Sequence, residues 1–337
     1  MVEKPMISDQ IIRESVKANY GIDVVSLSLL PLGADINAAT YKALALDQTP
    51  YFIKIKRGHS SDTSIEILDL LQHAGIKQII PPIKTRHGTL FQSIDTCTLI
   101  VYPFVEGIDG FNRDLKDTQW IELGTALRKV HEVEVPPPMQ QKIRREAYSS
   151  KWRDLLKSIY PAVEEHLDTD KVGLELQKFM KKNISDIIRL VDRAEHFATI
   201  LKDSSSDFVL CHSDIHAGNV LLGENAHVYI VDWDEPIMAP KERDLMFIGG
   251  GVGNVWNNPN EEALFYQGYG DTKIDATTMS YYRHERIVED IAIYSQELLL
   301  KKGGGEDRLL MYKHFVAMFE PNGVVEIAFK TDANLAL

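Results

Sequence analysis

Three oxygen-bearing side chains lie near one another in the sequence, between short apolar runs. Asp214 precedes Asn219 by five residues, and Asp232 follows Asn219 by thirteen. An amide oxygen and a carboxylate are the hard ligands that Mg²⁺ prefers, and a second carboxylate can accept the proton of a substrate hydroxyl. The spacing therefore predicts phosphoryl transfer from ATP to an alcohol, with Asp214 as catalytic base and Asn219 and Asp232 as ligands of Mg²⁺.

Two alternatives to phosphoryl transfer are compatible with this segment. His212, Asp214 and His216 alternate in a pattern that also suits a zinc hydrolase. Zinc sites usually have three or four nitrogen or sulfur ligands, however, and the sequence has no second His/Cys cluster downstream. The second alternative is a polar loop without chemistry. Two acids and an amide at this spacing favour phosphoryl transfer, in which His212 shapes the loop by hydrogen bonding.

The apolar runs around these residues have the composition of buried strands. They are rich in β-branched and aromatic residues and end at Gly, Asn or Asp, which is typical of short strands; they cover residues 208–210, 220–222 and 228–231. The chain is mostly strand-like over 24–99 and mostly helical from 117 onward. This pattern predicts an α+β fold, and the length of 337 residues allows two lobes.

Two or three helices are expected in the segment of about 149–202. Pro161 and the segment 168–170 are expected to separate its helices. Further along, Asp244 is expected to cap the N-terminus of a helix, because an Asp side chain can accept from the unsatisfied first N–H groups. Glu285 and Glu289 share one face of a helix expected over 281–299, where a solvated stripe is favoured over a wall that binds amines.

The segment from His212 to Asp234 resembles the aminoglycoside phosphotransferase family. The family signature H-G-D-x-H-x-x-N, followed by a strand and I-D-W, corresponds to residues 212–219 and 231–233, with Ser213 in place of glycine. The resemblance implies the cofactors ATP and Mg²⁺ and a two-lobed protein-kinase-like fold. The expected parts are an N-terminal nucleotide-binding lobe over 1–101, a hinge over 102–107 and a C-terminal lobe over 108–337 with a helical insertion at about 149–202. Segments 232–256 and 281–290 resemble the members that act on spectinomycin, so the likeness implies this cationic aminocyclitol as substrate and antibiotic resistance as the outcome.

The resemblance also suggests how the nucleotide is bound. Lys54, in an expected strand over 51–56, matches the family's phosphate-binding lysine, although Lys56 shares its face by the period of two. Glu66, on a helix expected over about 63–73, is the candidate partner of Lys54, with Asp62 as the alternative. Residues 33–37 occupy the position that covers the phosphates, but they lack a G-x-G-x-x-G sequence.

Two further groups of residues are candidates for contact with the nucleotide and the substrate. Adenine is expected to bind backbone groups near Tyr102 and Phe104, since the intervening Pro103 has no N–H to donate. Asp234 and Glu235 directly follow the metal ligand and are candidates to meet substrate amines. Trp256 is expected to pack either on the substrate or in the core.

The composition limits the class of protein. The net charge is −12, from 37 Lys and Arg against 49 Asp and Glu, which argues against nucleic acid as a partner and suits a cationic small molecule. Cys97 and Cys211 are expected to be buried free thiols, as in a reducing compartment. The N-terminal residues lack the apolar core of a signal peptide, and no run reaches the roughly 18 apolar residues of a membrane span. A cytoplasmic protein of unknown oligomeric state is expected.

Two alternative functions remain on the sequence alone. One is a kinase of the same fold that acts on a metabolite such as choline, homoserine or a methylthio sugar. The other is a catalytically silent protein that sequesters the drug. The presence of Lys54, Asp214, Asn219 and Asp232 together argues against the silent binder.

Overall fold

The computed structural model describes residues 7–30, 38–57, 63–165, 169–204, 207–224, 226–301, 305–333 and 335. The expected phosphate-covering segment at 33–37, the alternative partner Asp62 and the expected break at Asp168 lie outside these residues. The chain forms two compact units. A strand-rich unit comprises Met1–Asp109, Val133–Ile143 and Val220–Glu235, and a helical unit comprises Gly110–Glu132, Arg144–Asn219 and Pro236–Leu337.

The strand-rich unit contains a five-stranded antiparallel sheet in the order β1-β2-β3-β5-β4. Its strands are β1 (Val24–Leu30), β2 (Ala38–Ala45), β3 (Pro50–Arg57), β4 (Gln92–Ile94) and β5 (Cys97–Pro103). A second sheet has the order β10-β9-β6, from β6 (Gly107–Asp109), β9 (Val220–Gly223) and β10 (Val228–Ile230). The helices of this unit are α1 (Asp9–Tyr20), α2 (Thr63–His73) and α4 (Pro137–Gln140).

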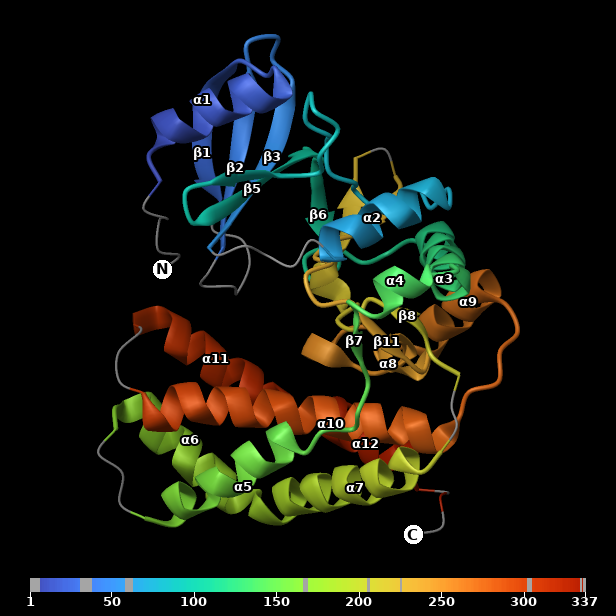
Figure 1. The fold of residues 1–337 in the computed structure, drawn as a ribbon. Helices are drawn as coiled ribbons and strands as arrows, with labels where there is room; N and C mark the ends of the chain where they lie inside the picture. Colours follow the sequence, from blue (N-terminus) through green and yellow to red (C-terminus); the bar gives the residue numbers. More distant parts are fainter. Residues whose placement is uncertain are drawn as a thin grey trace. The chain divides into compact units, whose positions relative to one another are not determined.

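Helix α1 packs on one face of the larger sheet (Figure 1). Its Ile12 and Val16 are fully buried against alternate residues of the strands, among them Tyr41, Ile53 and Ile55. Because successive side chains of a strand point to opposite faces, Lys54 and Lys56 must point away from α1. The sheet therefore presents both lysines together on the face that α1 does not cover.

The helical unit has its main core around one long helix, α10 (Ala276–Ser295). Figure 1 shows the helices that surround α10. Buried residues of α10 share one core with those of α5 (Lys151–Glu164), α6 (Lys171–Lys182), α7 (Ile184–Lys202), α11 (Gly305–Ala317) and α12 (Val324–Thr331). The remaining helices are α3 (Asp117–Glu132), α8 (Glu242–Leu245) and α9 (Pro259–Tyr269). A small sheet has the order β7-β11-β8, from β7 (Arg144–Arg145), β8 (Val209–Cys211) and β11 (Ile237–Ala239).

The observed elements confirm an α+β chain with a strand-rich N-terminal part and a mainly helical C-terminal part, and they differ from the expectation in two details. Residues 108–337 were expected as one continuous lobe, whereas 133–143 and 220–235 belong to the strand-rich unit. Pro161 was expected to break a helix, but α5 continues through it to Glu164. Within the described residues, no helix has both the length and the apolar character needed to cross a bilayer.

Candidate active site

Asp214 lies on a tight loop of the helical unit, between β8 and the 3₁₀ turn Ala217–Asn219. The loop is fixed by its own side chains. The backbone N–H of Asp214 donates to Nδ1 of His212 at 3.2 Å, and Nδ2 of Asn219 donates to the backbone carbonyl of Asp214 at 2.8 Å. Asp214 and Asn219 are thus brought together locally, and His212 shapes the loop as the sequence predicted.

The carboxylate of Asp214 is held by two cationic or basic side chains. Nη1 of Arg286 on α10 lies 2.5 Å from Oδ1, and Nε2 of His216 lies 3.5 Å from Oδ2. Burial would raise the pKa of Asp214, but Arg286 and His216 outweigh it and hold the pKa far below its usual range. The side chain is 42% exposed, so an ionised carboxylate is both fixed and accessible.

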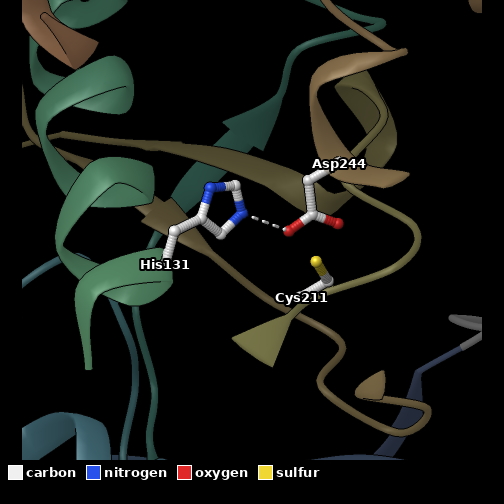
Figure 2. A group of neighbouring side chains, drawn as sticks. All are labelled: His131, Cys211 and Asp244. Carbon is white, nitrogen blue, oxygen red and sulfur yellow. Dashed lines mark hydrogen bonds and ion pairs between the residues drawn. The ribbon is translucent and has the colours of Figure 1, made fainter. Parts of the chain in front are cut away.

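The fully buried carboxylate of Asp244 binds the backbone of this loop. Oδ2 of Asp244 accepts from the N–H of His212 at 2.9 Å, and Oδ1 accepts from the N–H of Ser213 at 2.7 Å. Nε2 of His131 lies 3.0 Å from Oδ2 (Figure 2). The prediction of Asp244 as a helix cap is wrong, because Asp244 lies within α8 and the Lys241 cap position makes no side-chain hydrogen bond. Buried N–H groups of the loop need an acceptor, and Asp244 supplies it.

His131, Cys211 and Asp244 form a buried group whose possible ligand atoms all lie within 4.8 Å of one another (Figure 2). Nδ1 of His131 lies 2.8 Å from the hydroxyl of Tyr269, and the Cys211 thiol donates to the carbonyls of Ala239 and Pro240 at 3.7 and 3.6 Å. Burial raises the pKa of the Cys211 thiol. In this structure His131 and Asp244 are joined by a hydrogen bond, and Asp244 in turn binds the backbone of the loop 212–219 that carries Asp214.

Ser213 has a backbone conformation that favours glycine. Its φ is 77°, in the left-handed region that costs residues with a Cβ roughly 1–2 kcal/mol, and the residue is 3% exposed. This position is the one where the family signature has glycine. Serine is thus accommodated here with a backbone conformation that glycine adopts without strain.

Replacing Ser213 by glycine is expected to give a more stable protein than replacing it by alanine. Both changes remove the hydroxyl, but only glycine relieves the positive φ, by about 1 kcal/mol after its larger unfolded-state entropy is counted. Thermal unfolding of the two variants measures the difference, which we expect to be about 2 °C or more. An alanine variant as stable as the glycine variant would show that the backbone at Ser213 is not strained.

The strand-rich unit contains its own cluster of lysines and aspartates. Nζ of Lys54 lies 2.6 Å from Oδ2 of Asp234 and 3.6 Å from Oδ1 of Asp232, and Nζ of Lys56 lies 2.9 Å from Oδ1 of Asp234. Burial would lower the pKa of Lys54, but the two carboxylates outweigh it and raise the pKa. Asp232 has a φ of 63°, and such left-handed residues other than glycine are concentrated at functional sites.

The expected pair of Lys54 and Glu66 does not form. Glu66 on α2 binds Nζ of Lys142 at 3.1 Å instead, and the carboxylate of Asp234 takes the position on Lys54. No local pattern in the sequence indicates Lys142 as this partner. The ammonium groups of Lys54 and Lys56 already bind Asp234. Burial would raise the pKa of Asp234, but these two groups outweigh it and lower the pKa. The expected contact of Asp234 with substrate amines therefore has no support in this geometry.

The remaining candidate residues have different surroundings. Glu235 is exposed just before β11. Trp256 is 5% exposed and packs edge-to-face on Trp120 with ring centroids 5.0 Å apart, so the core alternative is the one observed. Tyr102 and Phe104 are partly exposed at the end of β5, and the N–H of Phe104 donates to the carbonyl of Pro50 at 3.4 Å.

The expected solvated stripe on α10 is wrong for Glu285. This residue is 6% exposed and forms a buried ion pair with Arg153 on α5. Glu289 is half-buried, and burial raises its pKa. Helical periodicity placed both residues on one face, but it could not show that α5 covers part of that face.

Comparison with known proteins identifies the class to which this fold and loop belong. Residues 28–275 match the model of the phosphotransferase enzyme family. The chain therefore belongs to this family and is an enzyme with a protein-kinase-like α+β fold, as the sequence predicted. A comparison with curated proteins gives no match.

Two solved structures of spectinomycin phosphotransferase APH(9)-Ia resemble the chain over nearly its whole length. The complex with ADP and spectinomycin is 47% identical, with a TM-score of 0.92, and the match covers 98% of this chain and 99% of the other. The AMP-bound complex is 46% identical, with a TM-score of 0.88, over 97% and 99%. Amicoumacin kinase hAmiN, with AMP-PNP, Ca²⁺ and Ami, is 16% identical with a TM-score of 0.63 over 96% and 94%, and shares the fold.

Proposed function

We propose that this protein is an ATP-dependent kinase that phosphorylates a hydroxyl group of spectinomycin and thereby confers resistance to it. The observation that carries the proposal is the 47% identity, over nearly the whole of both chains, to an enzyme whose structure contains ADP and spectinomycin. The net charge of −12 agrees with a cationic substrate.

Asp214 is the catalytic base in this proposal. The substrate oxygen forms a bond to the γ-phosphorus of ATP, the bond from that phosphorus to the leaving oxygen of ADP breaks, and the hydroxyl proton passes to Asp214. The contact with Arg286 keeps the carboxylate ionised and able to accept a hydrogen bond. Such positioning and proton acceptance account for about 10²–10⁴-fold in rate.

Asn219 and Asp232 are the proposed ligands of Mg²⁺. The Asn219 amide donates through Nδ2 to the carbonyl of Asp214, so Oδ1 is the end that remains for a cation. The Asp232 carboxylate is 47% exposed, and two oxygens of these types fit the preference of Mg²⁺ for a few protein ligands beside water and phosphate. The bound ion would neutralise charge on the phosphates.

The phosphorylated product accounts for the proposed resistance. A phosphate monoester adds a charge of about −1.5 to −2 at neutral pH, which opposes binding of the drug to its anionic ribosomal target. We also propose a cytoplasmic location, because Cys97 and Cys211 are buried free thiols, as is usual in a reducing compartment.

Lys54 is expected to contribute more to ATP binding than Lys56. Lys54 approaches both Asp232 and Asp234, whereas Lys56 approaches only Asp234. Lys54→Met should therefore lower kcat/KM for ATP by about 10²-fold, and the matched change Lys56→Met should lower it only a few-fold. Steady-state kinetics with varied ATP measures both. Equal losses in the two variants would contradict the assignment of Lys54.

The proposed function is tested by magnesium-dependent release of ADP together with mass spectrometry of the product. The alcohols to compare are spectinomycin, kanamycin, hygromycin, choline and homoserine. Phosphorylated spectinomycin as the sole product is the expected result. Turnover of another alcohol instead would overturn the substrate assignment, and drug binding without turnover of any alcohol would identify a silent binder.

A further inference from the structure

Arg286 links the proposed catalytic base to a second carboxylate. Its Nη1 lies 2.5 Å from Oδ1 of Asp214, and its Nε lies 3.1 and 3.2 Å from the two carboxylate oxygens of Asp290. The guanidinium also lies over the ring of Phe247, 5.5 Å from its centroid. One planar cation is thus fixed from three sides, and one of its contacts is the base.

The helix that carries Arg286 is itself well anchored. Ile287, Val288 and Ile291 of α10 are buried in the main core of the helical unit. One turn earlier, Arg283 donates to the carbonyls of Met246 and Ile248 at 3.3 and 2.9 Å. Asp290 lies four residues after Arg286, a spacing at which helical side chains meet. The guanidinium therefore has little freedom to move away from Asp214.

The charged groups around this contact come from three segments. Glu289 and Asp290 share α10 with Arg286, His216 lies on the catalytic loop, and Arg243 lies on α8. Burial would lower the pKa of Arg286, but Asp290, Asp214 and Glu289 outweigh it and raise the pKa. Arg286 therefore remains a cation beside Asp214 throughout the pH range in which an enzyme is assayed.

We propose that Arg286, anchored by Asp290, is a positioning residue that binds Oδ1 of Asp214 and so presents Oδ2 to the substrate hydroxyl. This inference rests on the proposed function, in which Asp214 is the base. His216 lies 3.5 Å from Oδ2, beyond a good hydrogen bond, whereas the contact of Arg286 with Oδ1 is short. The two carboxylate oxygens are thus unequal, and the hydroxyl meets the one that Arg286 does not bind.

The guanidinium is required for its shape as well as for its charge. A planar fork donates to two carboxylates at once with fixed geometry, whereas an ammonium group is a point charge on a flexible stem. Lysine at position 286 would retain a positive charge near Asp214 but would not hold both carboxylates in one plane. Charge and geometry can therefore be separated by experiment.

The test compares Arg286→Ala, Arg286→Lys and Asp290→Asn with the wild-type protein, with spectinomycin and ATP as substrates. Arg286→Ala should lower kcat by about 10²-fold, as expected for a misplaced catalytic group. The KM for ATP should change little, because the nucleotide is assigned to Lys54 and Asp232 rather than to Asp214. Guanidinium chloride at millimolar concentration should restore part of the lost kcat.

Arg283→Lys is the matched control, because Arg283 lies on the same helix and binds carbonyls rather than Asp214. It should leave kcat within a few-fold of the wild-type value, and guanidinium should have no effect on it. A kcat of Arg286→Ala close to that of the wild type, or a loss of kcat that guanidinium does not restore, would overturn the inference. If Arg286→Ala does not fold, wild-type kcat in both Arg286→Lys and Asp290→Asn would overturn it. Failure of the wild-type protein to phosphorylate spectinomycin would instead overturn the proposed function.

Discussion

Replacing Asp214 by alanine is expected to lower kcat by about 10²- to 10⁴-fold, the range that removal of a general base produces. The substrate hydroxyl would lose both its proton acceptor and the group that orients it. Nucleotide binding should change little. In the proposed mechanism Asp214 accepts the substrate proton, whereas Lys54 binds the ATP phosphates and Asp232 binds Mg²⁺. Single-turnover kinetics and equilibrium binding of ATP separate the two effects.

The control for this change is Asp186→Ala, which removes an exposed carboxylate from the first turn of α7. It changes the net charge of the chain by the same amount as Asp214→Ala and should leave kcat unchanged. Arg286 retains Asp290 as a partner when Asp214 is removed, so no buried charge is left unpaired. Near-normal turnover in the Asp214→Ala variant would rule out Asp214 as the base.

Replacing Asp244 by alanine is expected to destabilise the helical unit by about 3–5 kcal/mol, as removal of one partner from a buried charged network does. The buried N–H groups of His212 and Ser213 would lose their acceptor, and His131 would lose its contact. Urea unfolding measures the loss. Hydrogen exchange over residues 209–220 should show that the catalytic loop loses protection first. Asp275→Ala, which removes only the cap of α10, should cost about 1 kcal/mol.

The stability that Asp244 contributes should decrease at low pH. Burial would raise the pKa of Asp244, but its contacts with His131, His212 and Ser213 lower it below the ordinary value. A carboxyl group with a lowered folded-state pKa stabilises the protein above its unfolded-state pKa, and this stabilisation is lost as the pH falls. The difference between wild type and Asp244→Ala should therefore be full at pH 7 and shrink below about pH 4. A difference that does not shrink would contradict the ionised state of Asp244.

The parts of the site that could be predicted from sequence are those determined by local interactions. Within their loop, Asp214 and Asn219 are brought together by hydrogen bonds between residues at most five positions apart, so a short motif is enough to place these two side chains near each other. The strands β3, β8, β9 and β10 were also predictable, because a short apolar run rich in β-branched and aromatic residues and bounded by turn residues is a local pattern.

The parts that could not be predicted from sequence depend on contacts between distant segments. Asp244 binds the loop from about 30 residues downstream, and Arg286 reaches Asp214 across 72 residues. No fixed separation in the sequence predicts either contact. The expected Lys54–Glu66 pair does not form for a similar reason. Lys54 binds Asp234 instead, which lies 180 residues away in the sequence, and only the tertiary structure brings the two together.

The interleaved boundaries of the two units have a consequence for synthesis of the protein. The strand-rich unit draws its last residues from Val220–Glu235, and β6 has its partner in β9. While the chain emerges from the ribosome, this unit cannot be completed until Glu235 has been made, although domains usually fold in order from the N-terminus. Much of the helical unit emerges in the meantime. The two units must therefore mature together, and neither can be obtained by a single truncation of the chain.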